Sequence, residues 1–515
     1  MLAQAAQLRY DVSFLVDTAG YSFCGISLAD IILFALAVTL AWFISSSACQ
    51  YFRLCHFDGP LLAKTSNLWL FASVNSGRSH LDFWQVTQKY GTIARVGLND
   101  LITDDPALVK YMCNVKTEYR RSSWYDGMRF NPTSNNCLST RDEIAHSTLR
   151  SKMAAGYAGR DVDNIETKID NNIREFVRLL ERYSDTRAPV DLGRKVQYFT
   201  LDVISDLAYG APFGFVGTDT DVYEYIKTTE RNLPMVMMVT VFPWVLTLLN
   251  SAILKRLLPS TKDRLGFGRI MSIAKDVAAE RFKPDVKDER DMLASFIRHG
   301  LTQTESESEI LLQIAAGSDT TASAIRSTML QMCLNHVILR KLRQEIASAN
   351  IASDIISDSE AKSLPYLQAV IKEGLRTFPP IAGLMSKEVP PQGDRWNGVF
   401  IPGGTRVGYS IWAITRREDI WGTDALEFRP ERWLEPPPDK VKEMESTLDL
   451  IFSYGRWLCL GRTIALIELN KVFVELIRRF DFTVCDPDKP WKVFNHGVFS
   501  QSQLWMHVTR TKGRE

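Results

Sequence analysis

Residues 452–461 read FSYGRWLCLG and place one cysteine, Cys459, between two glycines. Gly455 and Gly461 allow a tight turn and the close approach of a flat cofactor. Helical periodicity starts directly after Gly461, which predicts that Cys459 precedes a helix N-terminus, where the dipole and free N–H groups favour a thiolate. Phe452 supplies an apolar wall. A buried structural thiol is the plain alternative, but the loop suits a single metal–sulfur bond better than a zinc site, which needs more ligands nearby.

The composition of the whole chain excludes several other classes of protein. The 515 residues carry 61 Lys and Arg against 60 Asp and Glu, a formal charge of +1. Nucleic-acid-binding proteins usually show a clear basic excess, so no nucleic-acid partner is expected. The eight cysteines are scattered without a CxxC pair, which argues against a disulfide framework or a zinc cluster. No GxGxxG fingerprint of a flavin or nicotinamide site occurs.

Two charged motifs lie upstream of the cysteine loop. Glu373 and Arg376 stand three residues apart in EGLR and share a helix face. The segment FRPERW at 428–433 adds Arg432. A solvated surface pair is the alternative for Glu373 and Arg376.

A third motif, AAGSDTT at 315–321, combines a helix-interior glycine with an acid and two threonines. Gly317 costs about 1 kcal/mol in a helix relative to alanine, so we expect it to make room for a group against the helix. The Thr320 hydroxyl can donate a hydrogen bond to such a group, and Asp319 can connect that place to solvent protons. An ordinary helix with an Asp on its polar face is the alternative.

Together these motifs resemble the cytochrome P450 family, the haem-thiolate monooxygenases. The loop matches the family pattern Phe-x-x-Gly-x-x-x-Cys-x-Gly, and the other motifs follow in the family's order over roughly residues 55 to 510. The resemblance implies haem b (iron protoporphyrin IX), with Cys459 as the axial ligand of its iron. It also implies that Glu373, Arg376 and Arg432 form a buried charge network that locks the cysteine loop. The AAGSDTT motif corresponds to the family's oxygen-activating helix, which implies that Gly317 makes room for dioxygen and substrate and that Asp319 and Thr320 are catalytic.

The resemblance further implies contacts to the haem propionates. His146 and Arg150, four residues apart on one helix face, correspond to two such donors, and Lys387 to another. An exposed basic helix is the alternative for the first pair. The chain departs from the family at the position two residues before the cysteine, which is Trp457 and not Arg. Arg456, or the indole N–H of Trp457, is then expected to make that contact.

An apolar stretch near the N-terminus predicts a membrane anchor. Residues 31–52 carry no charge and could span roughly 30 Å as a helix. A signal peptide or a buried helix is the alternative, but acids dominate the residues before the stretch, where a signal peptide carries bases. The positive-inside rule assigns residues 1–30 to the extracytosolic side and the catalytic domain, 53–515, to the cytosol. The domain division is therefore 1–30, 31–52 and 53–515.

The body is expected to be mainly α with a minor β region, a cytochrome P450 fold behind the transmembrane helix. Apolar stripes predict helices over 163–183 and 466–480, and short strands are expected at 92–96 and 399–410. The uncharged stretch Asn232–Leu254, broken by two prolines, is expected to dip into the bilayer or to cover a greasy cavity. This stretch, with Ile381 and Ala382, is a candidate wall of that cavity. So is the loop Ser122–Asn136, which carries Trp124, Tyr125, Met128 and Phe130. Core packing is the alternative for the aromatic loop.

The predicted function is insertion of one oxygen atom from dioxygen into an apolar small molecule. Electrons come from NADPH through a membrane-bound flavoprotein reductase, which Arg456 and Arg462 could help to dock. The expected location is the endoplasmic reticulum membrane, single-pass. Details such as Arg456-Trp457 are most similar to fungal enzymes of secondary metabolism. Two alternatives are a haem-thiolate isomerase or dehydratase that needs no external electrons, and a non-catalytic haem sensor.

Overall fold

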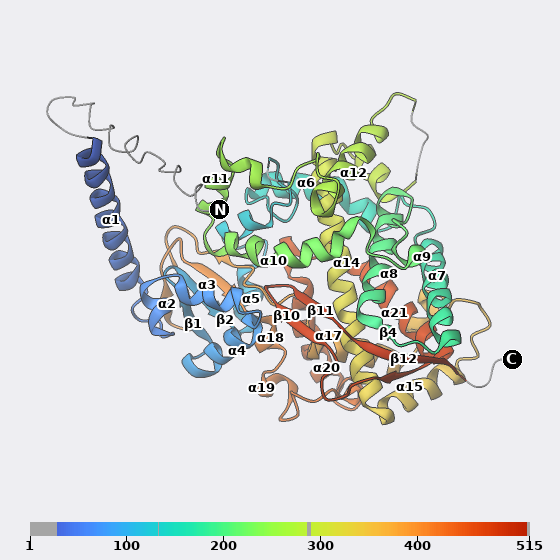
Figure 1. The fold of residues 1–515 in the computed structure, drawn as a ribbon. Coiled ribbons are helices and arrows are strands. Elements are labelled where there is room, and N and C mark those ends of the chain that lie inside the picture. Colours follow the sequence, from blue (N-terminus) through green and yellow to red (C-terminus); the bar gives the residue numbers. More distant parts are fainter. Residues whose placement is uncertain (1–27, 132, 286–289, 512–515) are drawn as a thin grey trace, which may run out of the picture.

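A computed structural model of the chain describes residues 28–131, 133–285 and 290–511. Helices make up most of the body, the sheets are small, and α1 projects away from the rest (Figure 1). This arrangement confirms the mainly α prediction with a minor β region. The α-helices are α1 Leu28–Arg53, α2 Leu61–Thr65, α3 Leu68–Asn75, α4 Ser79–Tyr90, α5 Pro106–Met112, α6 Glu143–Tyr157, α7 Ile165–Thr186, α8 Leu192–Tyr209, α9 Phe215–Thr218, α10 Tyr225–Val241, α11 Trp244–Leu249, α12 Gly266–Arg281, α13 Met292–Arg298, α14 Gln303–Leu334, α15 His336–Ser348, α16 Asp358–Lys362, α17 Pro365–Thr377, α18 Ile411–Ile414, α19 Glu418–Trp421, α20 Pro438–Leu448 and α21 Arg462–Arg479. Short 3-10 helices are η3 Ser123–Met128, η4 Val222–Glu224, η5 Leu254–Leu257, η6 Pro430–Trp433, η7 Asp449–Phe452 and η8 Gly455–Trp457.

The strands form one five-stranded sheet and three smaller ones. Their order in the large sheet is β1-β2-β8-β5-β3, with β2 and β8 parallel and the other neighbours antiparallel. The strands expected at 92–96 and 399–410 are confirmed as β1, β7 and β8. The strand bounds are β1 Ile93–Gly97, β2 Asp100–Thr103, β3 Arg120–Arg121, β4 Val190–Asp191, β5 Lys387–Glu388, β6 Asp394–Trp396, β7 Val399–Ile401, β8 Arg406–Tyr409, β9 Phe480–Val484, β10 Lys492–Asn495, β11 Phe499–Ser502 and β12 Trp505–Arg510.

The long helix α14 runs through the middle of the body and packs along α8 (Figure 1). A capping box of Thr302 and Glu305 starts it by satisfying N–H groups that its first turn leaves free. Gly317 lies close to α8, because a Cβ there would meet Ile204 Cγ1 of α8 at 2.9 Å. The missing side chain of Gly317 therefore makes room for α8. Gly317 and Ile204 also line the internal cavity described below, so the expectation that Gly317 makes room for dioxygen and substrate stays a prediction.

Two predicted helices are confirmed with small shifts of their ends. The stripe over 163–183 is α7, whose inward face buries Ile169, Ile173, Phe176 and Leu180. The stripe over 466–480 belongs to α21, which begins at Arg462, three residues after Cys459. Lys471 of α21 is fully buried and pairs with Glu166 and Asp170 of α7 at 2.6 and 2.8 Å, so the helix that follows the cysteine loop is fixed against the core.

Within the described residues, one helix is long and apolar enough to cross a membrane, Ala29–Arg53, by length and composition only. The stretch predicted as an anchor, 31–52, lies inside it. Its last turn is attached to the body, because the fully buried Arg95 donates to the carbonyls of Gln50 and Tyr51. Arg53 donates to Gly403 O and Thr405 Oγ1. The predicted segment 1–30 lies almost wholly outside the described residues.

The uncharged stretch Asn232–Leu254 covers the end of α10, α11 and the start of η5. Met237 and Val241 pack in a core cluster, whereas Trp244, Leu248 and Ile253 are exposed. None of the stretch lines the cavity described below, so the prediction that it forms a cavity wall is wrong.

The aromatic loop Ser122–Asn136 is also core packing, the alternative named for it. Trp124, Tyr125 and Met128 are buried in one cluster, and Phe130 packs against Phe267. They do not line the cavity; its contributions from this region are Cys137 and Leu138, directly after the loop. Among the other wall candidates, Ile381 lines the cavity and Ala382 packs elsewhere in the core.

Candidate active site

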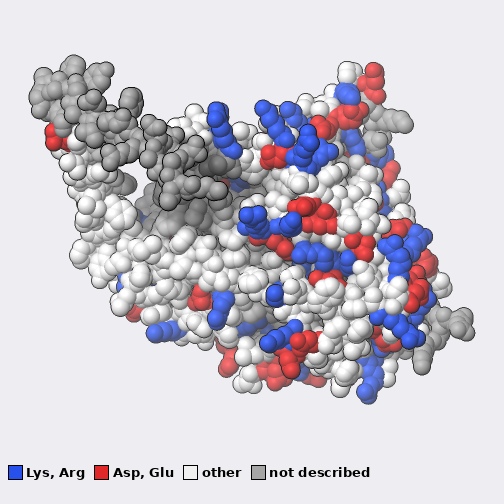
Figure 2. Space-filling view, in the orientation of Figure 1, with Lys and Arg blue, Asp and Glu red and all other residues white. Residues whose placement is uncertain are grey.

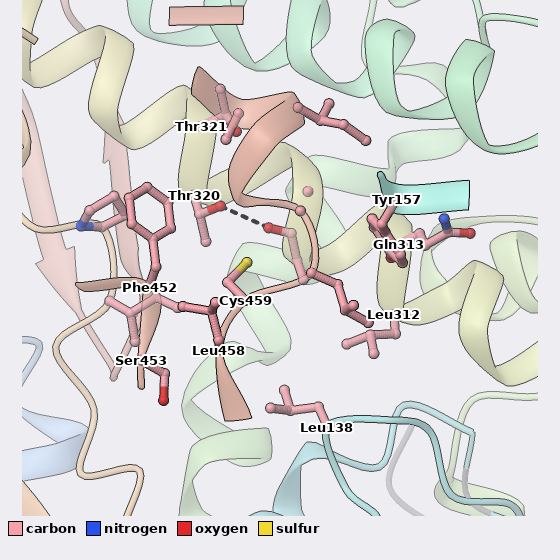
Figure 3. A pocket seen from close by; sticks show the side chains of 18 of the residues that line it. Leu138, Tyr157, Leu312, Gln313, Thr320, Thr321, Phe452, Ser453, Leu458 and Cys459 are labelled. Carbon is pink, nitrogen blue, oxygen red and sulfur yellow. Dashed lines mark hydrogen bonds between the residues drawn. The ribbon is translucent and has the colours of Figure 1, made fainter. Parts of the chain in front are cut away.

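The cysteine loop joins η7 to α21 and presents the Cys459 side chain to an internal cavity (Figure 3). The backbone N–H of Cys459 donates to Phe452 O at 2.8 Å, which closes the loop into a compact turn. Gly455 has φ +58° and lies so close to α5's end that a Cβ would meet Cys113 O at 2.1 Å. A glycine is therefore required at 455 for both conformation and space.

Two opposing effects act on the Cys459 thiol. Its sulfur accepts hydrogen bonds from the backbone N–H groups of Gly461 and Arg462, as expected before a helix N-terminus. Burial is the larger effect, and the pKa of the Cys459 thiol is raised. The N–H groups at the helix terminus thus act in the expected direction, toward a thiolate, and burial opposes them.

The cavity lies between α14 and the cysteine loop and measures about 270 Å³. Residues from α6, α8, α14, α21 and the segment after α17 form its wall. Most of that wall is apolar, including Leu138, Ile204, Leu312, Ala316, Leu375 and Ile381. Cys459, Phe452 and Thr320 share this cavity, which places a soft sulfur ligand and a hydroxyl in one apolar space (Figure 3).

Three cations lie in or near the cavity wall, and the acids of this region, Glu143 and Glu309, make no ion pair with them. Arg121 and Arg150 line the cavity wall, and Lys387 is fully buried nearby. Arg121 donates to the carbonyls of Cys137 and Thr140, and Lys387 to Tyr125 Oη and Met385 O. Within the described part of the chain, none of the three has a carboxylate within ion-pair distance. Buried charge of this kind is stable only beside an anion.

Neutral donors near the cations are also unpartnered. His146 is 1% exposed and neither ring nitrogen makes a hydrogen bond. Burial and the charges of Arg121, Arg150 and Arg456 lower its pKa to about 3, so it is neutral at physiological pH. The buried indole N–H of Trp457 has no acceptor either, while the Lys387 ammonium lies 4.7 Å from its ring.

Arg456 differs from the other predicted propionate donors. Its guanidinium donates to the carbonyls of Val115 and Thr117 and does not line the cavity. One of its nitrogens lies 3.8 Å from Glu143. Arg121, which no local spacing singled out in the sequence, occupies the cavity wall instead.

The two residues predicted to be catalytic point in different directions from α14. Thr320 lines the cavity and its hydroxyl donates to Ala316 O at 2.8 Å, the dashed line in Figure 3. Asp319 is not part of the cavity wall. Its Oδ1 accepts from Gln197 Nε2 of α8 at 2.6 Å.

Glu373, Arg376 and Arg432 form the buried network that the resemblance implied. Arg376 makes a bidentate pair with Glu373 at 2.7 and 2.9 Å, and Arg432 Nε lies 3.4 Å from the same carboxylate. The exposed fractions are 0%, 0% and 2%, which excludes the alternative of a surface ion pair. Trp433 Nε1 and the Arg429 N–H also donate to Glu373. The network ties α17 to residues 415–433 and makes no direct contact with the cysteine loop among the hydrogen bonds of the described residues.

A second group of polar residues in the cavity was missed from the sequence. Glu309 of α14 accepts from the Cys137 N–H, and burial raises its pKa to about 8. Gln313 lies one turn further along the same face, with Tyr157 of α6 beside it (Figure 3). The sequence gives no clear signal for Glu309, because it is the last of three acids, Glu305, Glu307 and Glu309, at the start of the helix.

Comparison with known proteins identifies the family. The family profile Cytochrome P450 matches residues 61–508. "Cytochrome P450 monooxygenase ABA1" of Pyricularia oryzae is 42% identical over 491 residues, 92% of this chain and 96% of the relative. "Cytochrome P450 monooxygenase aba1" of Botryotinia fuckeliana is 38% identical over 88% and 91% of the two chains, and abl1 of Leptosphaeria maculans is 34% identical over 91% and 85%. The chain therefore belongs to the cytochrome P450 family and is an enzyme of the P450 monooxygenase type.

Proposed function

We propose that the chain is a membrane-anchored haem-thiolate monooxygenase that inserts one oxygen atom of dioxygen into an apolar small molecule, as a step of secondary metabolism. The observation that carries this proposal is the single cavity that holds both the Cys459 sulfur and the Thr320 hydroxyl between α14 and the cysteine loop. The names of the fungal relatives agree with the class of reaction.

The residues around the cavity fit haem b. Cys459 would hold the haem iron through its sulfur, and Phe452 would supply an apolar wall of the same cavity. Arg121, Arg150 and Lys387, with the free donors His146 and Trp457, would neutralise the two propionates, which supplies the anions that these buried groups lack. Arg456 is assigned a positioning role on the loop, since its donors are used by carbonyls of residues 115 and 117. When bound, haem supplies the one-electron and oxygen chemistry of the reaction.

Thr320 and Asp319 would deliver protons to the oxygen side of the cavity. The Thr320 hydroxyl borders the cavity and can turn from Ala316 O to a ligand, because a hydroxyl rotates freely. Asp319 is outside the cavity wall and bonded to Gln197 of α8, and burial raises its pKa to about 6, so it exchanges protons near neutral pH.

The substrate class follows from the wall of the cavity. Leu312 and Ala316 of α14, with Ile381 and Leu375, present apolar groups. Such a wall gains free energy from apolar surface and cannot satisfy a strongly charged ligand. An apolar small molecule is the substrate class that fits it.

Electrons would come from NADPH through a membrane-bound flavoprotein reductase, because the chain carries no flavin or nicotinamide fingerprint. Arg462, 36% exposed, lies at the start of α21 beside the cysteine loop and pairs with Asp449. It is a candidate contact for an acidic partner, and Arg456, with 19% of its side chain exposed, is a second.

The membrane arrangement would have two parts. α1 spans the bilayer once, and the body faces the cytosol of the endoplasmic reticulum with residues 1–30 on the other side. Few charges cover α1, α2 and α3 in Figure 2, whereas both signs are mixed over the rest of that face. Exposed apolar side chains on α2, α3 and α11 would touch the lipid surface: Leu61, Leu62, Leu68, Trp244 and Leu248.

The direct test of the reaction class is turnover of lipophilic metabolites with isotopically labelled dioxygen, in the presence and absence of NADPH and reductase. The proposal expects one labelled oxygen atom in the product and none without NADPH. Equal conversion without electrons would favour an isomerase or dehydratase. A haem sensor would give two other results. The protein would bind haem but turn over no substrate of an adequate panel, and its Thr320→Ala variant would release no more peroxide than the parent.

A further inference from the structure

Asp319 is held by the neighbouring helix α8. Its Oδ1 accepts a hydrogen bond of 2.6 Å from Gln197 Nε2, and its Oδ2 has no hydrogen bond within the described residues. Asp319 is half-buried and is not part of the cavity wall.

Gln197 is itself fixed by two arginines. Its Oε1 accepts from Arg326 at 2.9 Å and from Arg194 at 3.3 Å. Arg326 is 1% exposed and also donates to Gly193 O at 2.7 Å. With its oxygen occupied by these two cations, Gln197 can only present its N–H₂ group to Asp319. The amide orientation follows from the network, and the Gln197 side chain has no freedom to turn.

The helix α10 contributes two hydroxyl groups near the same place. Tyr225 and Thr229 stand four residues apart on one face. Neither hydroxyl makes a well-formed hydrogen bond, and Tyr225 is 1% exposed. Burial and the charge of Asp319 raise the pKa of Tyr225, and the neighbouring Thr229 hydroxyl lowers it. Buried polar groups without protein partners are the usual position of an ordered water, which needs two to four of them.

The outer end of this arrangement reaches the surface. Arg194 of α8 pairs with Glu230 of α10 at 3.2 Å, and Ser500 of β11 donates to the same carboxylate. The side chains of Arg194 and Glu230 are 23% and 28% exposed. A continuous series of polar groups therefore runs from solvent to Asp319 along the interface of α8 and α10.

We propose that Gln197 is the positioning residue of Asp319, and that protons reach Asp319 along this α8–α10 interface and not through the substrate cavity. The proposal rests on the proposed function, in which Asp319 supplies protons. Neutral Asp319 gives up its proton on the α14 side. The resulting carboxylate takes one from a water held by Tyr225 and Thr229, and that water is reprotonated from solvent beside Glu230, so no charge or electron accumulates.

The charged and titratable groups that face Asp319 come from three helices. Arg326 of α14 and Arg194 of α8 lower its pKa, and so does the Gln197 hydrogen bond, while Glu230 of α10 raises it. Tyr225 of α10 is neutral because its pKa lies far above physiological pH. Burial is the largest effect, and the resulting pKa is about 6.

The test is the protonation of Asp319 in the complete, cofactor-loaded enzyme at rest. The carboxylic C=O band of labelled aspartate is followed by infrared spectroscopy against pH, with Asp319→Asn identifying the band. Gln197→Met, which removes the donor at similar volume, should raise the midpoint by about one pH unit or more. Gln197→Glu should raise it further, because it adds a like charge. An unchanged midpoint in either folded variant overturns the proposal.

Asn172→Leu is the matched control, because Asn172 donates to Asp206 of α8 at 2.9 Å, the same amide-to-carboxylate contact away from the cavity. It should lower the melting temperature and leave the Asp319 midpoint in place. A second readout is the pH profile of turnover, whose limb should move with the infrared midpoint.

The failure of the two proposals can be told apart. If Asp319→Asn keeps full turnover without extra peroxide, Asp319 supplies no protons and the proposed function is wrong in that step, whatever the infrared result. If Asp319→Asn is impaired while Gln197→Met leaves both the infrared midpoint and the pH profile unchanged, only the role of Gln197 is wrong. Glu230→Gln should slow turnover and enlarge the solvent isotope effect; no change in either would contradict the stated route.

Discussion

Single residues around the cavity divide into those with a local motif and those without one. Cys459, Thr320 and Asp319 could be predicted from the sequence, because each lies in a short motif. Arg121 and Gln197 were missed, since β3 and α8 meet the site only through the tertiary fold and no spacing along the chain reports that meeting. Trp457 shows the intermediate case: the departure from the family pattern is visible in the sequence, but its unpartnered indole N–H is visible only in the structure.

The protonation of Glu309 should make the free energy of unfolding depend on pH. Its folded pKa is about 8 against an ordinary 4.5, so the folded state binds a proton that the unfolded chain releases earlier. The stability of the wild type should therefore fall as pH rises from about 5 to 8, by on the order of 3 kcal/mol at most. Glu309→Gln keeps the acceptor for the Cys137 N–H and removes this loss.

Melting temperatures of wild type and Glu309→Gln between pH 5 and 8.5 check this expectation, with the same substitution at Glu307 of α14 as control. The two curves should separate as pH rises. Parallel curves would show that Glu309 is ionised at neutral pH and has a partner.

At the scale of elements, the sequence predicts helices and the site motifs on them well, because periodicity and caps act locally. It fails where two elements approach. Gly317 was expected to make room for a ligand; it lines the cavity, and it also makes room for α8, which the sequence does not show. The stretch Asn232–Leu254 was read as a cavity wall from its apolar composition, which does not distinguish a cavity wall from core and surface.

Gly317→Ala should destabilise the protein by about 1 to 3 kcal/mol, because the new Cβ meets Ile204 Cγ1 at 2.9 Å. Ile204→Ala removes the atoms it meets and should recover part of the loss in the double variant. Urea unfolding of the two single variants and the double variant measures the coupling. Additive effects would mean that the two helices separate freely.

Glu373→Gln should destabilise the fold by about 3 to 5 kcal/mol, because it leaves two buried arginines without their shared carboxylate. Haem content and the melting temperature of the purified protein are the measurements. Glu431→Gln, in the adjoining segment and paired with Lys341 at a half-exposed position, should change stability by less than about 1 kcal/mol. Equal losses of stability in the two variants would show that the buried network around Glu373 contributes no more than an exposed ion pair.

At the scale of the whole molecule, α1 and the body are joined through Arg53 and Arg95, so the anchor continues directly into the β1–β2 region. The sequence could predict the span from its length but not this attachment, because Arg95 lies more than forty residues further along the chain.

The anchor itself is testable by placing one charge in it. Leu36→Arg in the middle of α1 should cost about 2.5 to 3.5 kcal/mol of membrane insertion and release much of the protein on carbonate washing. Leu426→Arg is the control, since Leu426 is 67% exposed on the body and Leu36 is 60% exposed on α1. Similar retention of both variants would show that α1 does not hold the protein in the bilayer.

The central claim, that the Cys459 sulfur holds haem iron in this cavity, is tested most directly by the reduced carbon monoxide difference spectrum. Wild type and Cys333→Ser, which alters a buried thiol away from the cavity, should both give the thiolate-ligated spectrum. Cys459→Ser should lose that spectrum and its turnover together. A Cys459→Ser protein with the wild-type spectrum and full activity would contradict the account.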